Sequence, residues 1–247
     1  RNIVWRRELP GPGASSPIVW GDRVYLTCYS GYGIDNASGN PRDLKRHLLC
    51  LNRNDGAILW EESVATDVSE APFEGGLAHH GYASTTPVAD EEHVYVYFGA
   101  SGAAAYMHDG ERKWHRSCGT HVGGYGCASS PVLVGDMLIV DASAEAEGAP
   151  GQSALTALNK RTGEVLWTRS NVGGGGYLTP TLIEHQGGRC LAVSKPWGHE
   201  LAGVAIDDGS EIWRCSVSMY APTPVTDGAG LIFVFSKNGY AAVRAGG

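Results

Sequence analysis

The feature that most constrains this chain is a short phrase that returns at nearly regular intervals. A glycine precedes a tryptophan by four residues at Gly56–Trp60, Gly110–Trp114, Gly163–Trp167 and Gly209–Trp213. Together with Trp5, five of the seven tryptophans are spaced 55, 54, 53 and 46 residues apart. A period of roughly 40–50 residues is typical of a propeller or a solenoid. The sequence therefore predicts an array of similar units.

Each unit contains four short segments that we expect to be strands. The first carries a Ser/Thr-Pro step, the second is an unbroken apolar run, the third precedes the glycine, and the fourth ends on the tryptophan. Apolar runs of five residues between turn signals are typical of strands covered on both faces. The apolar runs are VYLTC, VYVYF, MLIVD, CLAVS and LIFVF. The Ser/Thr-Pro steps lie at Ser15–Val19, Thr85–Val88, Ser129–Val132, Thr179–Leu182 and Pro222–Val225.

These observations predict an all-β fold, a β-propeller of four-stranded antiparallel blades with about five repeats in one domain, 1–247. The repeats run over approximately 6–60, 61–114, 115–167, 168–213 and 214–247 plus 1–5. Two arrangements remain open. Either the N-terminal strand completes the last blade and closes a five-bladed ring, or the repeats are part of a larger propeller of seven or eight blades.

The bulk composition agrees with many tight turns and excludes several classes of function. Glycine makes up 35 of 247 residues, about twice its usual share of ~7%. The net charge of −7 argues against binding nucleic acid, which normally needs a basic surface. No apolar run approaches the ~18–20 residues of a membrane span. The first residues do not have the pattern of a signal peptide. We expect a monomer.

The six cysteines show no CxxC spacing, so zinc ribbons and thioredoxin-type sites have no support. Cys28 and Cys50 are expected on neighbouring strands, and Cys118 and Cys127 flank one loop. Either pair can bridge in an oxidising compartment. The alternative is that these positions only require small side chains.

The repeated phrase resembles a known family. ALNKRTGEVLW (Ala157–Trp167) and CLNRNDGAILW (Cys50–Trp60) are similar to the tryptophan-docking motif of PQQ-like β-propellers, which include quinoprotein alcohol dehydrogenase-like and BamB-like proteins. YMHDGERKW and AIDDGSEIW are shortened copies. In such a stack, a tryptophan on the fourth strand suits docking against the adjoining sheet. The expected docking residues are Trp5, Trp60, Trp114, Trp167 and Trp213.

The resemblance implies a quinone cofactor and calcium only for the dehydrogenases of the family. Those enzymes carry a pair of adjacent cysteines and a carboxylate-asparagine calcium site. This chain has no adjacent cysteines, and no residue matches the family's catalytic aspartate or calcium ligands. We therefore predict no catalytic residues, no metal site and no cofactor. PQQ and calcium remain possible through the resemblance alone.

Long insertions point to one face of the propeller as the binding face. Ser30–Arg46, Ala65–His80 and Ala144–Gln152 all lie in connections that emerge on the same side, and long loops on a rigid scaffold commonly carry binding sites. The candidate ligand-binding residues at the channel mouth and in these loops are His80, Tyr82, His121, Tyr125, Tyr177, Lys195, Trp197, His199, Tyr220 and Lys237.

Each candidate also has a purely structural interpretation. The tyrosines can pack where strands converge and bond to backbone, and the histidines are more typical of a polar lining than of a metal site. Trp197 can stack on a sugar or simply anchor its loop. The glycine run at 173–176 lacks the Lys-Ser/Thr of a phosphate-binding loop.

Three functions follow from these observations. The first is a non-enzymatic scaffold that binds a protein or another macromolecule through the looped face. The second is a module for a small ligand or carbohydrate, and the third is a relative or fragment of a PQQ-dependent dehydrogenase. The family resemblance implies a periplasmic or extracellular location.

Overall fold

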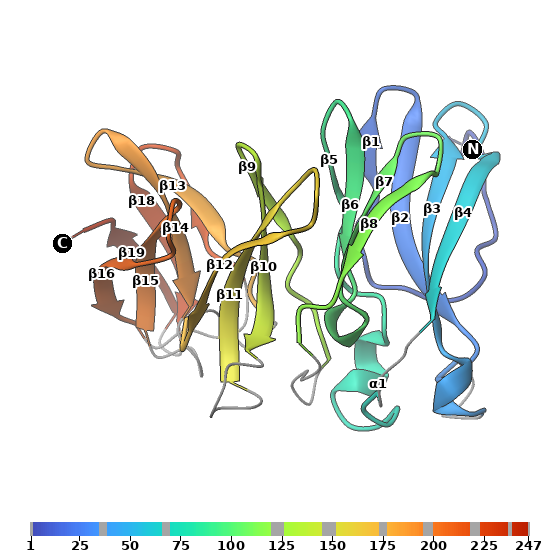
Figure 1. Cartoon of the computed structure of the whole chain (residues 1–247), viewed down its shortest axis with the longest axis horizontal. Helices are drawn as coiled ribbons and strands as arrows, with labels where there is room; N and C mark the ends of the chain where they lie inside the picture. The colour runs from blue at the N-terminus through green and yellow to red at the C-terminus, as the bar shows by residue number, and fades with distance from the viewer. Residues whose placement is uncertain are drawn as a thin grey trace.

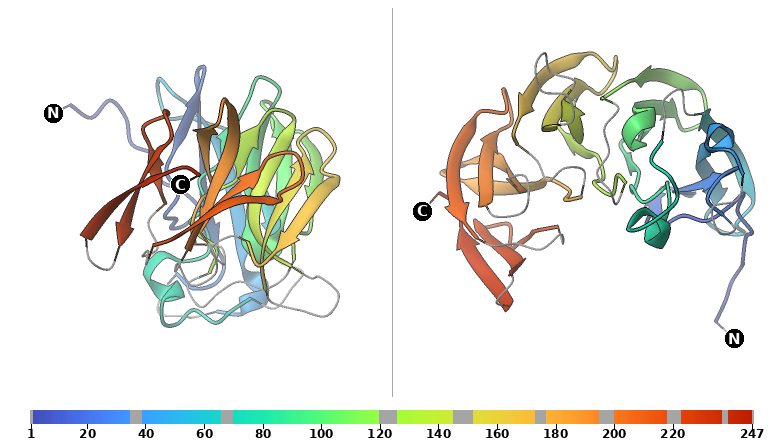
Figure 2. Two further views of the ribbon diagram at one scale, coloured as in Figure 1. Left: turned by 90° about the vertical axis from the view of Figure 1, so that its left-hand side faces the viewer. Right: turned by 90° about the horizontal axis from the view of Figure 1, so that it is seen from below.

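The computed structural model describes residues 2–34, 39–65, 70–119, 126–144, 152–172, 177–194, 200–217, 223–236 and 239–246. Within these residues the strands form five antiparallel sheets, numbered 1 to 5 in chain order. Sheets 1 to 4 have four strands and sheet 5 has three. The sheets stand side by side around a common centre, which confirms the all-β propeller architecture (Figures 1 and 2).

Consecutive strands pair within each sheet, so every sheet is built from one repeat. Sheet 1 contains β1 (Ile18–Trp20), β2 (Arg23–Ser30), β3 (Lys45–Asn52) and β4 (Ile58–Ala65); sheet 2 contains β5 (Val88–Ala89), β6 (His93–Tyr97), β7 (Ala103–Met107) and β8 (Arg112–Arg116). Sheet 3 contains β9 (Val132–Val134), β10 (Met137–Ala144), β11 (Gln152–Asn159) and β12 (Val165–Ser170); sheet 4 contains β13 (Thr181–His185), β14 (Gly188–Ser194), β15 (Glu200–Ala205) and β16 (Glu211–Ser216). Sheet 5 contains β17 (Val225–Thr226), β18 (Leu231–Ser236) and β19 (Gly239–Arg244).

In the described part of the chain, helical structure is confined to single turns: η1 (Pro41–Asp43), α1 (Leu77–His80) and η2 (Gly99–Ser101). None of the described helices is long and apolar enough to cross a membrane. Figure 1 places α1 at one end of the sheets, on the side opposite the short hairpin turns. The connection that carries α1 therefore lies on this side of the sheets, which we call the loop face.

In sheet 2 the second strand is buried on both sides, as its unbroken apolar run predicted. In sheet 5 the prediction is wrong for the run LIFVF, because Phe233 and Phe235 are 44% and 39% exposed on a face that no described sheet covers. All five residues of β6 are buried. Because side chains alternate along a strand, Val94 and Val96 pack in the cluster between sheets 1 and 2, whereas Tyr95 and Tyr97 pack between sheets 2 and 3. The core is thus divided into layers, one between each pair of sheets.

The closed five-bladed ring is wrong. No described segment forms a fourth strand beside β19, and the N-terminal residues lie at the opposite end of the arc from sheet 5 (Figure 2). Figure 2 shows that the five sheets turn through only part of a circle, so the two ends of the arc do not meet. Trp5 instead lies against sheet 1, where its indole Nε1 donates to Arg53 O at 2.9 Å.

Four tryptophans make the same contact with the next sheet along the chain. In each, the indole Nε1 donates to a backbone carbonyl in the turn between the third and fourth strands of that sheet. The pairs are Trp5 to Arg53 O (2.9 Å), Trp60 to His108 O (2.9 Å), Trp114 to Lys160 O (2.9 Å) and Trp167 to Ile206 O (3.0 Å). Burying a large ring while satisfying its N–H makes this a favourable inter-sheet contact.

The repeated glycine is needed for this contact. Gly163 has φ of 71°, a conformation that favours glycine, and a Cβ atom there would lie 2.7 Å from the Trp114 ring. The turn conformation and the close approach of the indole therefore both require glycine. The same relation holds between Gly56 and Trp5, Gly110 and Trp60, and Gly209 and Trp167.

Trp213 departs from the pattern. Its Nε1 has no hydrogen-bond partner among the described residues, and its ring lies over Gly203 of its own sheet. The residues opposite the tryptophan in sheets 1 to 3 are Cys50, Ala105 and Ala157. Gly203 has no side chain to hold the indole outward, so the ring settles inward onto the sheet.

A salt bridge reinforces the contact between sheets 2 and 3. Lys160 Nζ lies 3.0 Å from Asp90 Oδ2, and both side chains are largely buried. Burial alone would raise the pKa of the Asp90 carboxyl, but hydrogen bonds from the His93 N–H, Lys160, the Glu92 N–H and Tyr95 Oη outweigh it and lower the pKa. The folded protein therefore favours the charged carboxylate.

Replacing Trp114 with alanine should open the layer between sheets 2 and 3. Removal of a buried aromatic ring from a packed core costs about 3–5 kcal/mol. The measurement is the free energy of unfolding from urea titrations. Leu166→Ala on the exposed outer strand is the matched control, with an expected change within about 0.5 kcal/mol. Equal effects of the two substitutions would contradict the role of the indole.

Asp90→Asn should destabilise the protein by about 1–3 kcal/mol at pH 7, because it removes a hydrogen-bonded charge. The folded pKa lies below the unfolded one, so this contribution is present above about pH 4 and is lost as the pH falls through the lowered value. Urea titrations at pH 7 and below pH 4 measure both values. Glu111→Gln, in an exposed pair with Lys113, is the control. A difference from wild type that stayed undiminished at a pH below the lowered folded pKa would be inconsistent with this origin.

Candidate functional site

Two long connections build a small core of their own on the loop face. Tyr29, Leu77 and Tyr82 are buried in it, and Phe73 packs against its side. The Tyr82 ring meets Tyr29 edge-on at 5.4 Å and lies 6.0 Å from Phe73. The connection between sheets 1 and 2 is therefore packed onto the scaffold as an ordered layer.

A buried arginine joins this layer to the sheets beneath it. Arg46 on β3 is 4% exposed, and its Nη1 lies 2.7 Å from Glu70 Oε1 and donates to Ser101 Oγ at 2.7 Å. Its Nε donates to Tyr82 O at 2.9 Å, and its guanidinium carbon lies 5.7 Å from the centre of the Tyr82 ring. A buried charge is tolerated only when it is paired and hydrogen-bonded, and Arg46 meets both conditions.

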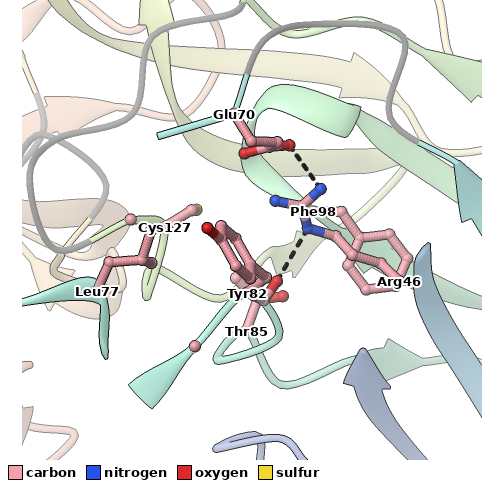
Figure 3. A pocket seen from close by; sticks show the side chains of 9 residues that line it. Arg46, Glu70, Leu77, Tyr82, Thr85, Phe98 and Cys127 are labelled. Atoms are coloured by element: carbon pink, nitrogen blue, oxygen red, sulfur yellow. Dashed lines mark hydrogen bonds and ion pairs between the residues drawn. The ribbon is translucent and has the colours of Figure 1, made fainter. Parts of the chain in front are cut away.

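A small pocket lies beside this ion pair (Figure 3). Figure 3 shows Arg46 and Glu70 at one side, with Cys127 and Leu77 across from them. The pocket leaves room for about one water molecule. Its nine lining residues are Arg46, Glu70, Leu77, Gly81, Tyr82, Thr85, Phe98, Gly126 and Cys127.

The pocket lining contains two conventional nucleophiles, the Cys127 thiol and the Thr85 hydroxyl, and the Thr85 hydroxyl donates to Tyr97 O. Burial, followed by the nearby Asp141 carboxylate, raises the pKa of this thiol to about 12. Because only the thiolate is a strong nucleophile, Cys127 is protonated and inert at neutral pH. The pocket is thus suited to binding a small polar group rather than to covalent chemistry.

All six cysteines have free thiols. Cys28 and Cys50 do lie on neighbouring strands, but Cys28 is opposite His47 whereas Cys50 is opposite Tyr25. Since side chains alternate, the two thiols face opposite sides of sheet 1. That geometry prevents a bridge between them.

Of the predicted ligand residues, Tyr82 lines the pocket but its hydroxyl is already used, because Oη donates to Ala71 O at 2.7 Å. His80 closes α1, with Nδ1 2.9 Å from Ser84 Oγ, and burial followed by the neighbouring His79 lowers its pKa. Tyr177 is half-buried and is not part of the pocket lining. The other predicted residues, His121, Tyr125, Lys195, Trp197, His199, Tyr220 and Lys237, lie outside the described residues.

Sequence reasoning missed the central pair of the site. Arg46 carries a weak signal, since it lies between Lys45 and His47 at the polar start of a strand whose next four residues, LLCL, are apolar. Glu70 lies 24 residues further along, inside a long connection, and nothing in its local sequence marks it as a partner. The pairing depends on how that connection folds back over sheet 1.

Glu70→Gln should destabilise the protein by about 3–5 kcal/mol, because Arg46 is left as an uncompensated buried charge. The double variant Arg46→Met/Glu70→Leu should lose less free energy of unfolding than the sum of the losses of Arg46→Met and Glu70→Leu measured separately. Arg214→Met, which removes an exposed cation, is the control and should cost less than about 1 kcal/mol. Thermal and urea unfolding measure these differences. Additive single effects would show that the two charges are not coupled.

Comparisons with known proteins agree with this architecture. The family model described as outer membrane protein assembly factor BamB matches residues 41–171. BamB from Moraxella catarrhalis is 18% identical, with a TM-score of 0.48, over 97% of this chain and 74% of that one. No curated protein matches the sequence.

Two solved dehydrogenases share the fold. The quinohemoprotein alcohol dehydrogenase ADHIIG from Pseudomonas putida HK5 is 15% identical, with a TM-score of 0.55, over 99% of this chain and 44% of its own. The quinohemoprotein alcohol dehydrogenase from Comamonas testosteroni is 13% identical, with a TM-score of 0.56, over 95% of this chain and 43% of its own. The chain thus spans less than half the length of these enzymes, and at these identities the likeness extends to the fold alone. Because the BamB family model matches more than half of its residues, the chain belongs to the PQQ-like β-propeller repeat family of the outer membrane protein assembly factor BamB.

Proposed function

We propose that the chain is a scaffold that binds a protein partner through its loop face. The observation that supports this most directly is the ordered loop layer, which has its own core and is tied to sheets 1 and 2 by the Arg46–Glu70 pair. A surface that is already ordered loses little conformational entropy on binding, so it suits recognition of a folded or extended protein.

The exposed part of this layer has mixed chemistry. Ile34 is 44% exposed, and Pro72, Glu74, Ala78 and His79 are also exposed. Isolated apolar side chains among polar and charged ones are typical of interfaces that form and dissociate. This surface therefore fits a protein partner better than a membrane or a nucleic acid.

The Arg46 pocket fits a redox cofactor poorly. PQQ is a rigid tricyclic tricarboxylate, whereas the pocket has room for about one water molecule. The arginine that would attract its carboxylates is already neutralised by Glu70 and donates to Tyr82 O and Ser101. Both points support a binding role for the loop face over a dehydrogenase role.

The family match supports the same proposal. The family is named for a factor in outer membrane protein assembly. By analogy, the partner of this chain is another protein of the bacterial envelope, and the location is the periplasm.

Site-specific photo-crosslinking tests the proposal. A photoreactive phenylalanine analogue at Ile34 or His79 should crosslink to a specific envelope protein in intact cells, at least about tenfold more than the same group at Leu59 or Leu166. The two control positions are exposed on the outer strands, away from the loop face. Equal crosslinking at all four positions would overturn the loop face as the binding surface. The adducts at Ile34 and at His79 should both disappear when the gene of the crosslinked partner is deleted, which establishes that they are specific.

A further inference from the structure

Sheet 1 carries a serine, a histidine and a glutamate in a row of close polar contacts that the loop-face function does not use. The serine and the histidine are hydrogen-bonded, and the glutamate lies at ion-pair distance from the histidine. Ser30 Oγ lies 2.7 Å from His47 Nε2, and His47 Nδ1 lies 2.8 Å from Glu61 Oε1. The three residues come from β2, β3 and β4, which are adjacent strands of one sheet. A nucleophile, a base and a group that orients the base are recognised by such geometry and not by their order in the sequence.

The register explains why the three side chains meet. Cys28 pairs with His47, and Leu49 pairs with Glu61. Since alternate residues share a face, Ser30, His47 and Glu61 all project from the side of sheet 1 that also bears Cys28 and Leu49. That side faces away from sheet 2 and packs against the N-terminal segment through Trp5 and Leu9.

The exposure of the three residues matches the roles they would need. His47 is 5% exposed, Ser30 is partly exposed and the Glu61 side chain is 35% exposed. The imidazole is hydrogen-bonded to the hydroxyl through Nε2, and its Nδ1 faces the Glu61 carboxylate without a hydrogen bond in this structure. Burial lowers the pKa of His47. The Glu61 carboxylate raises this pKa and Lys45 lowers it further, but burial is the largest effect, so the ring is a neutral base at pH 7. The remaining titratable group facing it is the Cys28 thiol, whose pKa burial raises to about 11.

The residue after the serine has a backbone N–H with no described backbone acceptor. Gly31 has φ of 86°, and a Cβ atom there would lie 1.9 Å from Asp43 O, so only glycine fits. Among the described residues, the Gly31 N–H donates to no backbone acceptor. The backbone N–H next to a nucleophilic serine commonly stabilises a developing oxyanion in hydrolases.

From this geometry we propose that Ser30, His47 and Glu61 form a hydrolytic site for carboxylic esters. The Ser30 hydroxyl attacks the carbonyl carbon while its proton passes to His47 Nε2. The C–O bond to the leaving alcohol then breaks, and that alkoxide takes the proton from His47. Water, deprotonated by His47, cleaves the acyl-Ser30 ester, which releases the carboxylic acid and restores the serine. Glu61 is a positioning residue that holds the imidazole and stabilises its protonated form.

The test uses the full chain with two probes, a fluorophosphonate that labels activated serines and p-nitrophenyl acetate. Peptide mass spectrometry of the folded wild type should find the phosphonyl adduct on Ser30. Ser30→Ala should abolish the adduct and the ester hydrolysis above buffer, and His47→Gln should slow both at least about 100-fold. Ser63→Ala is the matched control, because Ser63 is exposed and directly opposite His47 on β4 yet is not part of the row. It should react like wild type.

A pH profile separates a catalytic row from a purely structural one. The labelling rate should rise with pH through a single ionisation below the ordinary histidine pKa of about 6.5. Glu61→Gln should lower the rate and move that ionisation to lower pH, since the carboxylate favours the protonated ring. Circular dichroism melts establish that each variant is folded. Wild type that is labelled no faster than Ser30→Ala, or labelled at another residue, would overturn the proposal.

Discussion

The contact between a tryptophan and the turn of the following sheet governs the architecture of this protein. A four-stranded sheet with apolar residues on both faces cannot bury them alone, so each sheet needs neighbours. The indole sets how a neighbour is placed, because its N–H must reach one particular carbonyl and its ring must lie on one particular glycine. Four such contacts place successive sheets in equivalent positions, which produces a regular arc.

The two ends of the sheets are stabilised by different contacts. At the hairpin end, turns are short, and pairs such as Asp90 and Lys160 tie one sheet to the next. At the loop face, the connections are long and must be ordered by contacts of their own, which the Tyr82 cluster and the Arg46–Glu70 pair supply. A buried ion pair contributes little net stability compared with apolar packing. Its value here is positional, since Arg46 joins three segments that are distant in sequence.

The fold was predictable from the sequence because its main contact is local in form and repeated. Each glycine precedes its tryptophan by four residues, so one short segment contains both the turn that receives an indole and the indole that packs on the turn of the following sheet. The predicted position of a side chain was less accurate where contacts with residues distant in sequence determine that position. Trp213 has the same phrase, yet Gly203 on the paired strand lets its ring settle inward. Tyr82 was expected at a channel mouth, and the fold of its connection buries it in the loop layer.

The candidate sites depend on residues that the chain brings together from a distance. Arg46 and Glu70 are 24 residues apart, and His47 is 17 residues from Ser30. The sequence by itself determined the repeating unit, the strand order within each sheet and the face that bears the loops, because these follow from periodic burial and turn chemistry along one segment. Tertiary structure alone decided which polar side chains meet and whether the ring closes. Those outcomes depend on strand register and on the angle between sheets, and neither is encoded in any single segment.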